Sequence, residues 1–524
     1  MKTQRGALMI ELVTVLSFCA FFFFYGLGSF GLVGADEPRY AQIAREMLAR
    51  HDWVTPILNG VPWLEKPVLY YWGAMVSYSV FGAIDWAARV PTAFFATMMV
   101  VGTYGFMRRF RPGSQLDAAL VMTSLAGVIG FSRAASTDMP LTAMFTIGML
   151  AWFAWHTTEQ KRFLAAFYVF MALAALAKGP VAPFLAALII VVFAAARREW
   201  KLILRTLWVP GILLFLLVGL PWFVLVQRAN PQFVHIFIFE HNLARFGTNM
   251  FRHSQPFWYY VPVLAAGLLP WLVFIIAAFV RAVRESIRER SSFELFFLLW
   301  AVLPVVFFST SQSKLPGYIL PAVPPFAILV ADRLYRRTDE GNEPAFWTSA
   351  LHAFVVSGVL GGALLCVYFI LGMRPTGTAI GIAVVAGIVC FISMMAAIYG
   401  KGLRTLRIAT LIPVLLGMAF VIKFATPSID AKQSQRPVQR ALAEINAPAC
   451  AVYGTSRVVE YGLNFYRSQP IADYGRGEIP SGSHVVVTPA NFRDRVQLMV
   501  PGRTVTEAGT YEPQRLAFYL IGPK

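Results

Sequence analysis

The sequence predicts a mainly α-helical, polytopic membrane protein with a small α/β domain at its C-terminal end. Its 524 residues are 57% hydrophobic and only 14% charged, whereas soluble globular proteins carry about 25% charged residues. Many apolar stretches approach the roughly 20 residues that span a bilayer. Residues 424–524 instead alternate short apolar runs with polar turns. This composition argues against a cytosolic enzyme and excludes a coiled coil and a disordered chain.

The formal net charge of +18 is concentrated in the membrane portion. Residues 426–524 hold 11 Lys and Arg against 8 Asp and Glu, so most of the excess lies before them. There it forms short clusters between apolar runs, which is how the positive-inside rule orients membrane proteins. A nucleic-acid partner would require a basic surface that follows the phosphate backbone, so none is predicted.

Apolar segments that end at charge clusters define thirteen predicted spans. They are 9–34, 88–106, 116–132, 139–155, 163–177, 180–196, 206–226, 257–280, 294–309, 317–331, 346–371, 378–399 and 405–423. The first span follows a basic N-terminus and lacks an A-x-A cleavage site, so we interpret it as an uncleaved span.

Hydropathy alone would add a further span at 67–84, and the positive-inside rule argues against it. Suppose that 67–84 does not cross the membrane. The basic N-terminus then faces the cytoplasm, together with the clusters that begin at Arg108, Arg197 and Arg281 and the basic clusters after Arg281. If it crosses, every later cluster is inverted. We therefore predict that 67–84 is re-entrant or lies along the interface, where its Tyr and Trp residues are typical.

This topology places the N-terminus inside and the C-terminus outside. Residues 1–423 form the membrane domain, with two long external segments, 35–87 and 227–256. Residues 424–524 form an external α/β domain, since the helical pattern RPVQRALAEI precedes strand-like runs such as SHVVVTP and LAFYLIG.

Polar residues gather in the external segments rather than in the spans. The first cluster begins a predicted amphipathic helix and contains Asp36, Glu37, Arg39 and Tyr40. The apolar stripe of this helix is Tyr40, Ile43, Ala44, Met47 and Leu48, which predicts a helix lying on the membrane. Asp36 either caps the helix or helps to position or deprotonate an acceptor. The local sequence leaves both open.

Two further clusters hold Glu65 with Lys66, and Asp138. Glu65 and Lys66 form either a weak surface ion pair or a site in which the lysine contacts a phosphate at the lipid surface. Asp138 stands in the short external turn RAASTDMP. It either caps the next span or acts as a second carboxylate.

The remaining clusters are EHNLARF with RHSQP, which hold His241, Arg245 and Arg252, and SKLPGY, which holds Lys314 and Tyr318. His241 is either an ordinary hydrogen-bonding group or, with Glu65, a contact to phosphate or metal. All these clusters lie on the external side in the predicted topology. That topology was derived only from the positions of the Arg and Lys clusters between the spans. A basic, acidic and aromatic site at the membrane surface fits a lipid-phosphate substrate. A transporter would place polar groups near the midplane.

The strings ADEPRYAQIAREML, EKP, STDMP, AKGP, EHNLARF, QPFWYY and SKLPGYILP follow one another between residues 34 and 325. In them the chain resembles the GT-C membrane glycosyltransferases that use polyprenyl-phosphate-linked sugars, a superfamily that includes the protein O-mannosyltransferases. The nearest likeness is to the undecaprenyl-phosphate aminoarabinose:lipid A transferase family. The chain is somewhat shorter than those transferases, and its tail is compact.

The resemblance implies a GT-C fold in the bacterial inner membrane, with a cavity and a C-terminal domain on the periplasmic side. It implies a monomeric, inverting enzyme that moves a sugar, 4-amino-4-deoxy-L-arabinose as the best match, from undecaprenyl phosphate to lipid A phosphate. Two alternatives remain. One is the same chemistry with a protein or another envelope glycan as acceptor, and the other is a lipid transporter or flippase.

The resemblance also assigns roles to residues. Asp36 corresponds to the family's candidate catalytic carboxylate and Asp138 to a second one, while Lys66 is our first choice to neutralise the leaving phosphate. The expected binding residues are Glu37, Arg39, Tyr40, Glu65, Arg245, Arg252, Lys314 and Tyr318.

The role of Asp36 depends on the acceptor. With a hydroxyl acceptor it would be a general base. With an ionised phosphate it would orient groups or stabilise an oxocarbenium-like centre. No cofactor is required, because Lys and Arg can stabilise the charge. A divalent metal at Glu65 and His241 is the alternative.

Overall fold

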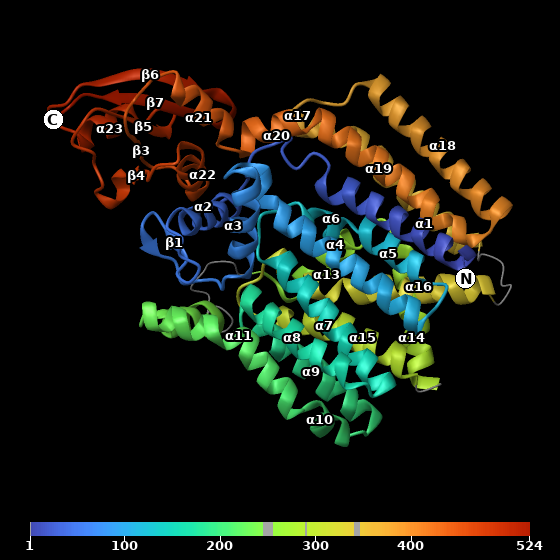
Figure 1. Cartoon of the computed structure of the whole chain (residues 1–524). Helices are drawn as coiled ribbons and strands as arrows, with labels where there is room; N and C mark the ends of the chain where they lie inside the picture. Colours follow the sequence, from blue (N-terminus) through green and yellow to red (C-terminus); the bar gives the residue numbers. More distant parts are fainter. Residues whose placement is uncertain (1, 245–254, 289–290, 340–345) are drawn as a thin grey trace.

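The computed structural model of the chain describes residues 2–244, 255–288, 291–339 and 346–524, and it is mainly helical (Figure 1). Its first part contains α1 (Lys2–Cys19), the π-helical η1 (Ala20–Phe24), α2 (Asp36–Ala49), β1 (Ile57–Leu58), β2 (Val61–Pro62), α3 (Leu69–Phe81), α4 (Asp85–Phe110), α5 (Gln115–Ser124) and α6 (Ala126–Ser132). The middle contains α7 (Asp138–Thr158), α8 (Lys161–Lys178), α9 (Val181–Arg197), α10 (Lys201–Thr206), α11 (Val209–Ala229) and the π-helical η2 (His235–Ala244).

The second half continues with η3 (Phe257–Tyr259), α13 (Tyr260–Gly267), α14 (Leu272–Arg288), α15 (Ser292–Ser309), η4 (Pro316–Ala322) and α16 (Pro324–Asp339). The last membrane helices are α17 (Phe346–Leu371), α18 (Gly377–Lys401) and α19 (Leu406–Phe424), with the short η5 (Leu403–Thr405) before α19. The N-terminus lies at the end of this bundle that is remote from the C-terminal domain (Figure 1).

Each of the thirteen predicted spans coincides with a helix or a bent helix pair. Within the described residues, eight helices are long and apolar enough to cross a membrane, or up to ten if each bent pair counts as one span. The bent pairs are α5 with α6, at 65°, and η3 and α13 with α14, at 115°. The other three predicted spans coincide with α7, α8 and α9. The number thirteen therefore stays a prediction.

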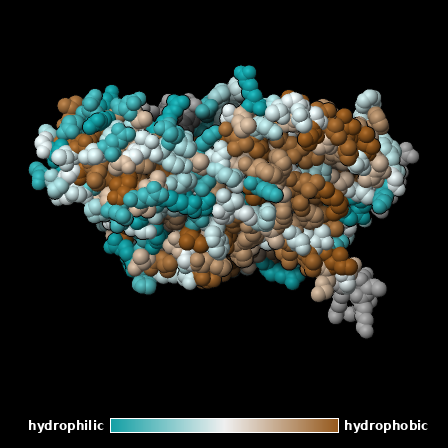
Figure 2. Space-filling model, turned by 90° about the horizontal axis from the view of Figure 1, so that it is seen from above, coloured by the Kyte–Doolittle hydropathy of each residue, from teal (hydrophilic) through white to brown (hydrophobic). Residues whose placement is uncertain are grey.

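The surface of the membrane helices is apolar, as lipid contact requires. Leu217 on α11, Phe354 on α17 and Val385 on α18 are exposed large apolar side chains. Figure 2 shows brown surface over the membrane helices, in contrast to the more hydrophilic C-terminal domain at the other end. These features confirm the predicted class of polytopic helical membrane protein.

The α2 and α3 helices are buried against protein, which corrects two predictions. The α2 stripe was expected to face lipid, yet Ile43, Ala44 and Met47 have no exposed surface. Tyr70 and Tyr71 on α3, expected at the lipid interface, are equally buried and belong to the same apolar cluster. The reason is that each helix covers the apolar face of the other. At 13 residues, α3 is about 20 Å long, shorter than the ~30 Å bilayer core, which agrees with a segment that does not cross.

The C-terminal domain is a sheet covered on both faces. Its helices are α20 (Thr426–Gln433), α21 (Arg436–Ala443), α22 (Arg457–Arg467) and α23 (Arg493–Met499), with short 3-10 turns η6 (Tyr474–Arg476) and η7 (Glu512–Gln514). Its strands are β3 (Cys450–Val452), β4 (Ala472–Asp473), β5 (His484–Pro489), β6 (Val505–Tyr511) and β7 (Leu516–Ile521). The order is β4-β3-β5-β7-β6, parallel between β4, β3 and β5 and antiparallel between β5, β7 and β6.

Successive side chains of β5 point to opposite faces of the sheet, and both faces are covered by helices. Val485 and Val487 pack with residues of α21 and α22, whereas Val486 packs with α23 on the other face. This period of two is that of a strand with both faces buried. The predicted α/β character of the tail is confirmed.

Polar contacts hold the C-terminal domain on the membrane domain. The Arg436 guanidinium donates to Asp85 at the start of α4 at 3.0 Å, and Asp430 of α20 accepts from the backbone N–H of Gly31 at 2.7 Å. The Tyr466 hydroxyl accepts from the backbone N–H of Leu32 at 2.7 Å. Arg45 of α2 donates to the carbonyl oxygen of Phe465 at 2.7 Å. Helix α22 is therefore anchored directly against the first external segment.

Candidate active site

The first helical turn of α2 presents Asp36 to solvent. The sequence left open whether Asp36 only caps this helix. In the structure α2 begins at Asp36 itself, and Ala35 occupies the N-cap position. The Asp36 carboxylate instead accepts a hydrogen bond from Arg39 at 2.6 Å, as the i,i+3 spacing on a helix permits. With 60% of its side chain exposed, Asp36 is accessible to a substrate.

Arg39 joins this carboxylate to the C-terminal domain. Its guanidinium carbon lies 5.1 Å from the ring centroids of Tyr40 and Trp63, and 5.8 Å from that of Tyr461 on α22. Cation–π contacts of this kind are stronger where the cation is desolvated, and only 11% of the Arg39 side chain is exposed. The stack thus holds the Asp36–Arg39 pair against both the first external segment and α22.

A second carboxylate–cation pair forms where α7 begins and α8 ends. These two helices form a hairpin, so Asp138 in the first turn of α7 meets Lys178 in the last turn of α8. Each charge also suits the dipole of its own helix. The two side chains form an ion pair, and the Lys178 ammonium lies 4.8 Å from the ring centroid of Tyr318.

The SKLPGY turn is packed directly onto Asp138. A Cβ atom on Gly317 would come within 2.7 Å of the Asp138 carboxyl carbon, so the turn requires glycine at this position. Of the two cluster residues predicted in this turn, Tyr318 therefore belongs to the Asp138–Lys178 pair. Lys314 does not, because it is nearly buried and its ammonium donates to the carbonyl oxygens of Ser311 and Gln255. Its contacts indicate a structural role rather than the predicted phosphate contact.

Carboxylates of both pairs act on the Tyr40 hydroxyl. Burial raises the pKa of its hydroxyl well above the ordinary value, and the negative charges of Asp36 and Asp138 raise it further. Carboxylates from two separate polar clusters of the sequence therefore act on the same phenol group. The structure brings the predicted residues Asp36, Arg39, Tyr40, Asp138 and Tyr318 into one region.

Glu37 has a different role from the predicted substrate contact. Its two oxygens accept hydrogen bonds from Nε and Nη2 of Arg89 and from the backbone N–H groups of Val33 and Ala135, at 2.6–2.9 Å. A carboxylate has about four acceptor positions, and all are used. Arg89 in turn donates its remaining hydrogens to the carbonyl oxygens of Leu27, Phe30 and Gly31. The Glu37–Arg89 ion pair is therefore a buried structural contact that joins the start of α2 to α4 and to the loop before α2.

Glu65 and His241 are neighbours, and Lys66 follows Glu65 in the sequence. His241 Nε2 and Glu65 Oε1 are 3.7 Å apart, and Lys66 is half-buried immediately after Glu65, shortly before α3 begins. Within the described residues, no group of three or more His, Cys, Asp or Glu is placed to hold a metal ion. Arg245 and Arg252 lie outside the described residues.

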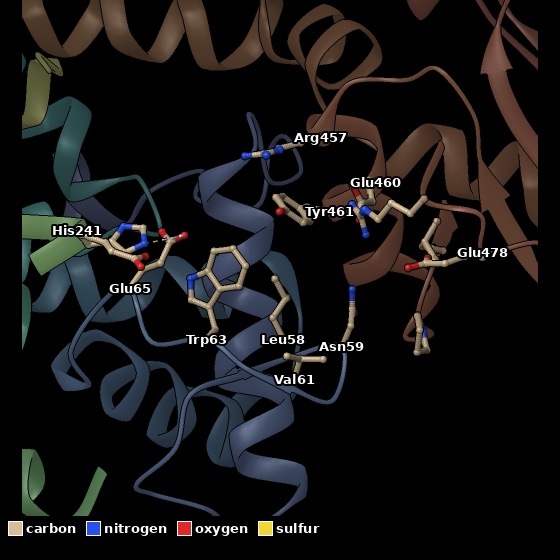
Figure 3. A pocket seen from close by; sticks show the side chains of 15 residues that line it. Leu58, Asn59, Val61, Trp63, Glu65, His241, Arg457, Glu460, Tyr461 and Glu478 are labelled. Carbon is tan, nitrogen blue, oxygen red and sulfur yellow. Dashed lines mark hydrogen bonds and ion pairs between the residues drawn. The ribbon is translucent and has the colours of Figure 1, made fainter. Parts of the chain in front are cut away.

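A cavity of about 1180 Å³ adjoins these groups. One side is formed by Glu65 and His241 and the opposite side by Glu460 and Glu478 of the C-terminal domain, with Trp63 between them (Figure 3). The volume exceeds the roughly 300–1,000 Å³ of typical small-molecule sites.

Some residues of this region carried no readable signal in the sequence. Lys178 was noted only as part of a polar turn, AKGP, because its pairing with Asp138 depends on the α7–α8 hairpin. Arg89 lies at the edge of a predicted span. Tyr461 lies on a helix of a separate domain, more than 400 positions after Arg39. No local pattern links these residues to the first external segment.

Two comparisons place these observations among known proteins. The model of the dolichyl-phosphate-mannose-protein mannosyltransferase family matches residues 9–237. The undecaprenyl phosphate-α-4-amino-4-deoxy-L-arabinose arabinosyl transferase of Erwinia tasmaniensis is 31% identical over 460 residues, which cover 83% of this chain and 79% of that protein. Arabinosyl transferase 1 of Pseudomonas fluorescens is 33% identical over 70% of this chain and 66% of its own length.

Solved structures share the fold. ArnT from Cupriavidus metallidurans bound to undecaprenyl phosphate has a TM-score of 0.79 and 22% identity, with 98% of both chains covered. The Archaeoglobus fulgidus oligosaccharyltransferase has a TM-score of 0.53 and 13% identity, with 94% of this chain and 70% of that chain covered. These likenesses confirm the predicted GT-C fold.

Proposed function

Because the chain belongs to the undecaprenyl phosphate-aminoarabinose arabinosyl transferase family, we propose that it transfers 4-amino-4-deoxy-L-arabinose from undecaprenyl phosphate to a phosphate group of lipid A. It is a multi-pass membrane glycosyltransferase that depends on a polyprenyl-phosphate-linked sugar. The lipid A acceptor, the bacterial inner membrane, the periplasmic orientation of the site and a monomeric state are parts of the proposal.

The observation that carries this proposal is the pair of carboxylate–cation contacts around Tyr40. The charges of Asp36, Arg39 and Asp138 all act on Tyr40, and Lys178 pairs with Asp138. Arg39 also lies against Trp63 and Tyr461, which line the cavity. Such an arrangement offers cations for phosphate groups and carboxylates for a sugar. A transporter would instead require polar groups near the middle of the spans.

The proposed reaction is an inverting displacement at the anomeric carbon of the sugar. An acceptor phosphate oxygen forms the new bond to that carbon while the bond to the undecaprenyl phosphate oxygen breaks, and the bonding electrons leave with the undecaprenyl phosphate. The leaving group gains negative charge, which a positioned cation stabilises most in the transition state. We assign this role to Lys66.

The carboxylates have a separate role in this scheme. An acceptor phosphate is already ionised near neutral pH, so Asp36 has no proton to remove. We assign it to orienting the sugar and stabilising positive charge at the oxocarbenium-like centre. We assign Asp138 to holding the Lys178 ammonium beside Tyr318.

A transfer assay with the purified protein tests the proposed function. The reactants are lipid A and undecaprenyl phosphate that carries either aminoarabinose or a neutral sugar such as mannose. We expect mass spectrometry to show lipid A with one added aminoarabinose, and much less product from the neutral donor. Transfer to protein or another glycan with unmodified lipid A would favour the second acceptor class. Lipid uptake into proteoliposomes without covalent transfer would favour a flippase.

We also propose that transfer requires no cofactor, since protonated lysine and arginine side chains supply the positive charge that the leaving phosphate needs. The Glu65–His241 contact is the position at which a metal would be sought. We therefore expect the initial rate of the purified enzyme to be unchanged after dialysis against a chelator, and His241→Ala to respond no differently. A loss of activity that an added divalent metal restores would contradict this expectation.

A further inference from the structure

The Tyr71 hydroxyl is a buried hydrogen-bond donor that has no acceptor among the residues the structure describes. Tyr71 is in the first turn of α3 and has no exposed surface. Its hydroxyl has no hydrogen-bond partner in the described part of the chain. Folded proteins rarely retain such a group, because its desolvation is not compensated, and an unpaired donor at a functional site calls for an explanation.

Two neighbouring donors are in the same state. Arg39 Nε and Trp63 Nε1 are also buried and have no acceptor among the described residues. The guanidinium carbon of Arg39 lies 5.1 Å from the Trp63 ring centroid, and the rings of Tyr40 and Tyr71 are 6.1 Å apart. All three unpaired groups can donate a hydrogen bond, and they lie in one small region. A ligand that supplies acceptor atoms there would satisfy them. Trp63 connects this region to the cavity, because it lines the cavity wall.

The charges around Tyr71 indicate which acceptor fits. Burial raises the pKa of its hydroxyl, which keeps the group protonated as a donor, and the charges of Arg39, Glu65 and Asp36 act on it. Two carboxylates would repel a phosphate placed among them. They would accept hydrogen bonds from sugar hydroxyl and amino groups, and a sugar hydroxyl oxygen can at the same time accept one from a phenol.

We propose that the Tyr71 hydroxyl donates a hydrogen bond to a hydroxyl oxygen of the transferred sugar. The inference rests on the proposed function, since it assumes a lipid-linked sugar donor. Because Tyr71 is enclosed in this structure, a neighbouring side chain has to shift when the donor binds. Trp63 is the candidate, as it is half-buried and belongs to the cavity wall.

The chain offers a matched control in the preceding residue. Tyr70 is equally buried on α3, and burial raises the pKa of its hydroxyl as well. Its hydroxyl differs in having a partner, because it donates to the carbonyl oxygen of Ala88 at 2.9 Å. Removing the Tyr70 hydroxyl therefore breaks a structural hydrogen bond, whereas removing the Tyr71 hydroxyl breaks none with the described residues.

The test compares Tyr71→Phe with Tyr70→Phe in the full-length protein. For Tyr71→Phe we expect a melting temperature at or above that of the wild type and a kcat/KM for the sugar donor that is about tenfold lower, the effect of one lost hydrogen bond. Binding of undecaprenyl phosphate without sugar should be unchanged. For Tyr70→Phe we expect a lower melting temperature and an unchanged kcat/KM in the folded fraction.

Three results would overturn the inference. Wild-type kcat/KM in Tyr71→Phe would show that the hydroxyl does not contact the donor. Equal weakening of undecaprenyl phosphate binding would place the contact on the phosphate rather than the sugar. A loss of stability like that of Tyr70→Phe, without an effect on the donor, would show that an ordered water satisfies the hydroxyl. Failure of the proposed function would look different from failure of this inference, because the wild-type protein itself would then transfer no sugar.

Discussion

Replacing Lys66 by Met, or Asp36 by Asn, is expected to abolish sugar transfer while the protein stays folded and inserted. Removing a group that stabilises charge only in the transition state typically lowers the rate by about 10²–10³-fold. The effect should appear equally in kcat and kcat/KM. Asp36 is largely exposed, so its replacement should change the melting temperature little. The measurement is the initial rate of lipid A modification together with thermal unfolding.

Controls for these variants are available in the C-terminal domain. Lys432 is exposed and donates to the carbonyl oxygen of Ile370, and Asp494 is exposed on α23. Lys432→Met and Asp494→Asn should transfer sugar at the wild-type rate. Full activity of both Lys66→Met and Asp36→Asn would show that the assigned residues do not carry the chemistry.

Replacing Glu37 by Ala is expected to cause the largest loss of stability. The substitution leaves the Arg89 guanidinium buried without its counter-charge and removes the acceptor for two backbone N–H groups. Breaking a buried ion pair from one side typically costs about 3–5 kcal/mol, because the remaining charge is uncompensated. The expected result is a strongly lowered melting temperature in detergent and reduced yield of inserted protein.

Two comparisons separate this effect from a general effect of removing a glutamate. Glu199 pairs with Arg197 at the surface, and pairs of that kind contribute little to stability, so Glu199→Gln should melt like the wild type. The double variant Glu37→Leu with Arg89→Met should recover part of the loss, because no unpaired charge remains. An unchanged melting temperature in Glu37→Ala would contradict the assigned role.

The membrane part of the fold could be predicted because its signal is local. Each apolar stretch of sufficient length corresponds to a helix or a bent pair, and the alternating runs of residues 424–524 correspond to the sheet. The environment of α2 and α3 could not be predicted in the same way. An apolar stripe shows that one face is buried, but lipid and protein satisfy it equally. The stripe of α2 faces α3 and the C-terminal domain.

For single residues of the candidate site, too, the local sequence does not show what a side chain contacts. Asp36 and Glu37 are adjacent carboxylates with the same local pattern, yet one is exposed beside Arg39 and the other is enclosed by Arg89. Two residues that were expected to bind substrate, Glu37 and Lys314, make buried hydrogen bonds within the protein. Polar clusters in the sequence contain both exposed side chains and side chains that are buried by structural hydrogen bonds, and a local pattern does not distinguish the two.

The sequence by itself determined that this is a membrane protein with a hydrophilic α/β tail, and which segments carry the polar chemistry. Hydropathy, charge clusters and short motifs are properties of contiguous residues, so they can be read without the fold. Only the tertiary structure decided that Lys178 pairs with Asp138, that Tyr461 of the tail stacks on Arg39, and that the Tyr71 hydroxyl has no acceptor within the described parts of the chain. The physical reason is that ion pairing, stacking and hydrogen-bond satisfaction depend on distances between atoms that lie far apart along the chain.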